Sequence, residues 1–115
     1  MSGLISQGNS QSVSAGTVVK VMTFPNCNTS TFDITNANTS AFSYVGVFRS
    51  NAAAYAMNHP TAGSAIGGQA MVIPPGQSKV IAGNFKANIN DAVYVAAITT
   101  TSNGQIVVAT PVTSN

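Results

Sequence analysis

Short runs of apolar and β-branched residues, separated by turn residues, follow one another along most of the chain. In the run 42–49 apolar side chains fall on both faces of an extended strand, which is typical of a central strand. In the run 32–35 they alternate with polar side chains, which indicates a half-buried strand. The predicted strands cover residues 17–24, 32–35, 42–49, 69–73, 79–85, 92–99 and 106–112.

The run 52–57 is ambiguous, because it holds three consecutive alanines and fits either a strand or one helical turn. A stretch of six residues is too short for a stable isolated helix, so a strand is predicted there as well. With or without this run, the pattern contains seven or eight short strands and no substantial helix. It predicts an all-β protein with an antiparallel β-sandwich or jelly roll.

Turn chemistry marks the ends of the strands. Pro74–Gly76 predicts a rigid turn, because proline presets one backbone angle and glycine supplies a positive φ. Ser102–Gly104 is the strongest hairpin signal in the chain and predicts that 106–112 returns antiparallel to 92–99.

The N-terminal segment is polar. Between Met1 and residue 12, its apolar residues are Leu4 and Ile5. We expect residues 1–16 to form a flexible arm or a short edge segment that reaches onto a neighbouring subunit, and residues 17–115 to form one β-sandwich domain. The segment lacks the basic and apolar regions of a signal peptide, so synthesis in a reducing cytoplasm is expected.

The composition points to a surface of uncharged amides and hydroxyls. Charged residues make up 5% of the chain, against about 25% in ordinary soluble domains, and glutamate is absent. Asn, Thr, Ser and Gln together account for 42 of the 115 residues. The net charge of +2 gives little repulsion between molecules and favours association, and four cations hardly make a nucleic-acid surface.

Few residues could carry chemistry. The candidates are His59, Cys27, Asp33 and Asp91, which are scattered singly, without the spacing of metal ligands or of a catalytic triad. We expect Asp33 to face solvent and Asp91 to accept hydrogen bonds in a turn, and we expect Cys27 to be an unreactive thiol. The sequence therefore predicts no enzyme, no metal and no cofactor, and no apolar run is long enough to cross a membrane.

The order of several motifs resembles small virion proteins of tailed bacteriophages, namely capsid decoration (cement) proteins and tail-associated β-sandwich proteins. The motifs are the asparagine-containing stretch 34–40, the strand 44–48, the Pro-Pro-Gly turn in 72–78, the strand 91–97 and the closing 104–108 segment. The resemblance covers residues 13–112. It implies a protein that binds the major capsid protein or other virion subunits, commonly as a trimer, in a particle assembled in the host cytoplasm.

Other functions remain open at this stage. A tail, neck or fibre component is a rival within the structural class, and a carbohydrate-binding sandwich or an ice-binding protein is a rival outside it. The absence of tryptophan counts against carbohydrate binding, and the lack of a regular threonine lattice counts against ice binding. The predicted interface residues are apolar residues at loop or terminal positions: Leu4, Ile5, Met57 and Met71.

Overall fold

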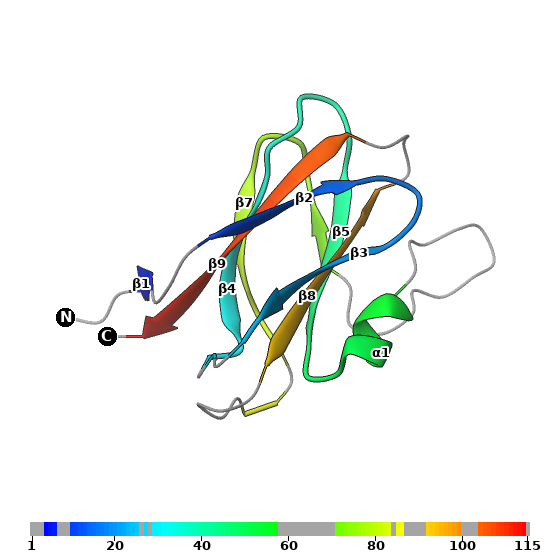
Figure 1. The fold of residues 1–115 in the computed structure, drawn as a ribbon. Coiled ribbons are helices and arrows are strands. Elements are labelled where there is room, and N and C mark those ends of the chain that lie inside the picture. Colours follow the sequence, from blue (N-terminus) through cyan, green and yellow to red (C-terminus); the bar gives the residue numbers. More distant parts are fainter. Residues whose placement is uncertain are drawn as a thin grey trace.

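The computed structural model confirms an all-β protein in which two antiparallel sheets pack as a sandwich beside one short helix (Figure 1). It describes residues 4–6, 10–25, 27, 29–57, 71–83, 85–86, 92–99 and 104–114. The elements are β1 (Leu4–Ser6), β2 (Gln11–Ala15), β3 (Lys20–Phe24), β4 (Thr31–Asn36), β5 (Ser43–Phe48), α1 (Asn51–Tyr55), β6 (Met71–Ile73), β7 (Ser78–Ala82), β8 (Val93–Thr99) and β9 (Gln105–Ser114).

The strand order is that of a jelly roll. One sheet has the order β2-β9-β4-β7, and β1 pairs with the far end of β9; the other has the order β3-β8-β5-β6. Strands β2 and β9, β3 and β8, β4 and β7, and β5 and β6 pair as they would in one long hairpin bent at the connection between β5 and β6. Rolling that hairpin up adds the pairs β4–β9 and β5–β8 and so produces the two sheets.

One turn prediction is wrong as a result. The strands β8 and β9 on either side of Ser102–Gly104 lie in different sheets and do not form a hairpin. Gly104 has a φ of 106°, so a left-handed residue does end this connection. Asn-Gly chemistry specifies a local reversal of the chain but not the sheet that the next strand joins.

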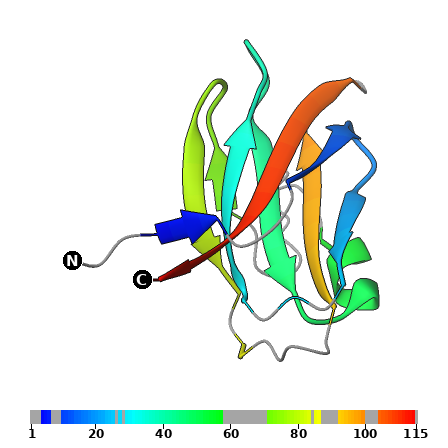
Figure 2. The ribbon, with the colours of Figure 1, turned by 60° about the vertical axis from the view of Figure 1, so that its left-hand side comes forward.

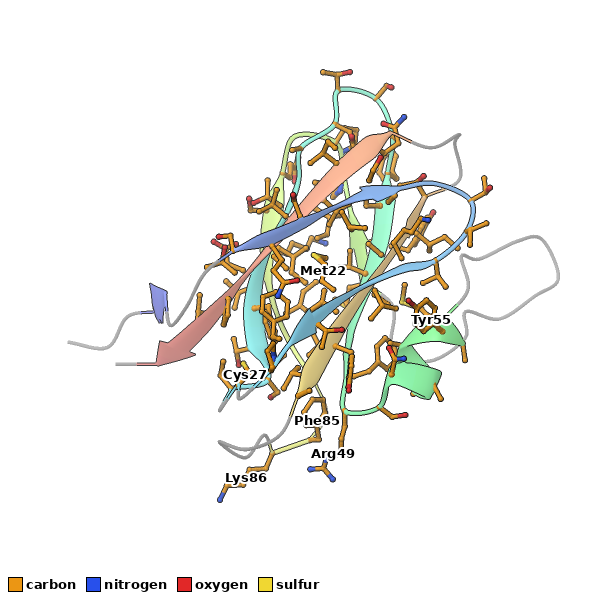
Figure 3. All side chains as sticks on the ribbon, in the orientation of Figure 1. Met22, Cys27, Arg49, Tyr55, Phe85 and Lys86 are labelled. Carbon is orange, nitrogen blue, oxygen red and sulfur yellow. The ribbon has the colours of Figure 1, made fainter. Side chains whose placement is uncertain are left out.

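The main core lies between the sheets. Phe32 and Ile34 of β4 are fully buried, whereas Asp33 between them is exposed, as the alternating pattern predicts. The rings of Phe24 and Phe32 pack against each other across the sandwich, with 4.8 Å between centroids and 51° between the ring planes. Burying a side chain of this size stabilises the fold by about 1.5–3 kcal/mol. Met22 lies at the centre of this core in Figure 3.

A second, smaller apolar cluster lies on the outer face of the sheet β3-β8-β5-β6, where α1 covers it. It contains Phe48, Ala96 and Ile98 from the sheet and Ala54 and Met57 from the helical segment. The strand predicted for 52–57 is therefore wrong over 52–55, which belong to α1.

The start of α1 explains this difference. The side chain of Ser50 accepts a hydrogen bond from the backbone N–H of Ala53 at 3.4 Å, which caps the helix. The packing of Ala54 and Met57 on the sheet supplies the stability that so short a helix lacks by itself.

The segment 1–16 contains both β1 and β2. Strand β2 pairs with β9 from Gln11 to Ala15, and Ala15 is fully buried in the main core, so residues 11–15 form an edge strand of the sandwich. Strand β1 lies outside the region where the two sheets overlap, and it runs beside the last three residues of β9 (Figure 2).

Candidate interaction surfaces

The outer face of the sheet β2-β9-β4-β7 is the most extensive open strand surface among the described residues. Strand alternation turns every second side chain of these four strands outward. We call this surface the hydroxyl face. Its residues are Ser12, Ser14, Thr31, Asp33, Thr35, Ser78, Val80, Ala82, Ile106, Val108 and Thr110.

Hydroxyl groups on this face bond to one another across neighbouring strands. The side chains of Thr35 and Ser78 lie 2.6 Å apart on β4 and β7, and Ser10 and Thr110 form a second such pair at the other edge. Asp33, near the middle of the face, is its single charged group. The face therefore offers polar groups whose hydrogen bonds are already partly satisfied within the protein, together with small patches of aliphatic surface.

The opposite outer face differs in chemistry and is already occupied. Tyr44 and Tyr94 are half-buried there around the cluster that α1 seals, and Val21 lies beside them. Tyr55 stands out from the helix with 54% of its surface exposed (Figure 3). This second face is thus apolar, and α1 covers part of it.

Two buried asparagines organise the turns at one end of the sandwich. The Asn36 side chain is fully buried, and its Nδ2 donates to the carbonyls of Ala41 at 2.7 Å and Ile73 at 2.9 Å. Its Oδ1 accepts from Asn38 Nδ2, and Asn38 Oδ1 accepts from the backbone N–H of Ile106 at 2.8 Å. One amide pair thus ties the 37–42 turn to β6 and β9.

Backbone hydrogen bonds of Asn36 also hold the Pro74–Gly76 turn in place. The Asn36 N–H donates to the carbonyl of Gln77 at 2.9 Å, and the Asn36 carbonyl accepts from the N–H of Gly76 at 2.9 Å. Gly76 adopts a φ of 72°, as predicted for this turn. The turns at this end, at the top of Figure 1, are therefore held rigidly in place.

The other end of the sandwich carries two of the four cations. Arg49 Nη2 donates to the carbonyl of Lys86 at 2.8 Å, and its guanidinium lies 5.3 Å from the centre of the Phe85 ring (Figure 3). Phe85 in turn packs against the main core, and its carbonyl accepts from Ser30 Oγ at 3.1 Å. These contacts fix the segment before β8 to the end of β5 and account for Arg49 structurally.

The four predicted interface residues fall in different environments. Met57 is 1% exposed and packs beneath α1 in the second cluster. Met71 is 50% exposed at the start of β6. Leu4 and Ile5 belong to β1, where their backbones pair with Ser114 and Thr113; their side chains lie outside the described part of the structure.

Further exposed apolar side chains lie on strands, in connections between strands and on α1. Hydrophobicity alone gave no signal for their exposure. They are Val18, Phe42, Tyr55, Val72, Val80 and Ile106.

Of the four candidates for chemistry, the structure describes Cys27 and Asp33. Cys27 is buried, and its thiol donates to the Thr29 carbonyl at 3.3 Å; Asp33 is exposed on β4 as predicted. His59 and Asp91 lie outside the described residues. Within the described ranges no three His, Cys, Asp or Glu side chains gather as metal ligands would, and no helix is long and apolar enough to cross a membrane.

Comparisons with known proteins give no match to this chain. No family model matches it, and no curated protein or solved structure is significantly similar. Inference about function therefore depends on the surface chemistry and the strand order.

Proposed function

We infer that this chain is a non-enzymatic virion structural protein, a capsid decoration protein that binds the outside of a phage head and stabilises the shell. The hydroxyl face is the observation that carries the proposal. It is a sheet surface with one charged group, and it stays open while the chain's own helix covers the opposite face. The proposed partners are the major capsid protein and further copies of this chain, in a homo-oligomer for which a trimer is favoured.

The physical chemistry of the hydroxyl face suits docking against another protein. Buried charges carry a large desolvation penalty, whereas hydroxyl groups that already bond to one another lose little when water leaves. The Thr35–Ser78 pair shows this arrangement. Contacts of this kind are individually weak, but many copies on one particle, linked within oligomers, bind with much higher overall avidity.

Two further considerations support the proposal. Jelly rolls are common in viral capsid and lectin domains, which is an analogy of fold and not of site. The order of motifs along residues 13–112 resembles decoration and tail-associated proteins. The jelly-roll fold is also compatible with a lectin-like module. The order of motifs is also compatible with a tail, neck or fibre component.

A pair of matched lysine substitutions tests the docking face. Val80 on the hydroxyl face and Tyr55 on α1 are apolar and similarly exposed, at 51% and 54%. Val80→Lys adds a hydrated charge directly opposite Asp33, a cross-strand arrangement that the sheet tolerates. Tyr55→Lys adds the same charge on the other side of the molecule.

The assay is co-sedimentation of each purified variant with particles that have been stripped of this chain. We expect Val80→Lys to bind at least tenfold more weakly than the unsubstituted chain and Tyr55→Lys to bind equally well. Equal binding by both variants, or selective loss with Tyr55→Lys, contradicts docking through the hydroxyl face. A chain that binds a glycan array but no particle supports the lectin-like module, and labelling confined to tails in electron micrographs supports the tail component.

A further inference from the structure

Strand β1 is attached to the rest of the molecule through a single neighbour. Its three residues pair with Val112–Ser114 of β9, and among the described elements β9 is its only substantial contact. Neither β2 nor β4 reaches this part of β9, because β2 pairs up to Ala109 and β4 up to Pro111. The two strands form a narrow ribbon that projects from the sandwich near both chain ends (Figure 1).

The pairing of β1 is also discontinuous with that of β2. Ser6 pairs with Val112 and Gln11 pairs with Ala109, so the chain has four residues between these two pairs on the N-terminal side (7–10) and two on the β9 side (110–111). The connection thus has more residues than the pairing requires, and one of them is Gly8. A connection of four residues spans at most about 14 Å.

The end of β9 is held up to Val112 by contacts that do not involve β1. The carbonyl of Val112 accepts a hydrogen bond from Thr29 Oγ1 at 2.8 Å, and the Val112 side chain is buried. The acceptor edge is therefore anchored at Val112, whereas β1 gains only three residue pairs by staying on it. An isolated two-stranded ribbon of this kind is marginally stable in water.

We propose that β1 exchanges between neighbouring copies of this chain and pairs with the Val112–Ser114 edge of a second copy. The contacts made between two copies are the same as those made within one, so exchange needs no new complementary surface. High local concentration on a particle favours the exchanged form. This exchange rests on the proposed function and adds to that function the element that links adjacent copies.

The test uses disulfides between directly opposed residues, whose backbones approach closely enough to be bridged. All variants carry Cys27→Ser, which retains a donor for the Thr29 carbonyl. The test variant is Ile5→Cys/Thr113→Cys, across β1 and β9. The matched control is Ser12→Cys/Val108→Cys, across β2 and the same strand.

The full-length chains are oxidised over a range of protein concentrations and separated by non-reducing electrophoresis. We expect the test variant to form covalent dimers and larger species whose share rises several-fold with concentration, while the control closes only within one chain. Closure of both variants within one chain overturns the exchange, and so does a test variant that stays reduced while the control oxidises. If the unsubstituted chain then still binds particles, the exchange alone has failed; if it binds none, the proposed function has failed with it.

Discussion

Replacing Asn36 by alanine is the perturbation for which the structure gives the clearest magnitude. The substitution removes two donors from the buried carbonyls of Ala41 and Ile73 and the acceptor for Asn38 Nδ2. A buried polar group left without a partner costs about 1–3 kcal/mol. Three such groups lose their partners, and partial relaxation of the turn reduces their summed cost. The free energy of unfolding is therefore expected to fall by about 3–5 kcal/mol, which is a large share of a typical domain's stability.

Urea unfolding followed by far-ultraviolet circular dichroism measures this loss. With an m-value of about 1.5 kcal/mol/M, the midpoint is expected to fall by about 2–3 M. The control is Asn51→Ala at the exposed first residue of α1, which is expected to change stability by less than about 0.5 kcal/mol. A double-mutant cycle with Asn38→Ala then isolates the coupling between the two amides. Equal, small effects of Asn36→Ala and Asn51→Ala would refute the buried amide network.

Two further substitutions probe other parts of the core. The hydroxyl of Ser43 is fully buried and has no hydrogen-bond partner among the described residues. Ser43→Ala is therefore expected to raise the free energy of unfolding by about 1 kcal/mol. The control is Ser12→Ala on the surface, which is expected to be neutral, and a loss of stability in Ser43→Ala contradicts the prediction. A Cβ at Gly83 would overlap the Phe85 ring, so Gly83→Ala is expected to cost about 1–3 kcal/mol. Most of that cost should disappear in a Phe85→Leu background, and an unchanged cost there contradicts the placement of the ring.

The strands from β3 onward could be predicted because each is specified by its own residues, whereas residues 11–15 of β2 were assigned to the N-terminal arm. The alternation around Asp33 gives the half-buried β4, and the two-sided apolar run of β5 gives a strand with a neighbour on each side. The sandwich follows from strand number and length. The helix α1 was missed because a short alanine run has no decisive period, although Ser50 three residues before Ala53 was a usable capping signal.

Relationships between distant segments could not be predicted from local pattern. The Asn-Gly turn before β9 gave no information that β9 would join β2 and β4 instead of β8. Asn36 lies just beyond the predicted strand 32–35, and composition does not reveal that this asparagine meets two buried carbonyls. The hydroxyl face likewise depends on the register of four strands, which only the folded arrangement brings together.

The most direct test of the central claim is quantitative mass spectrometry of purified phage particles from the cells in which this chain is made. The account predicts that the chain co-purifies with the particles in a fixed ratio to the major capsid protein, and that stripping it lowers the temperature at which the heads break open. A chain that is absent from the particles, or present without a fixed ratio to the shell subunit, would contradict a role in capsid decoration.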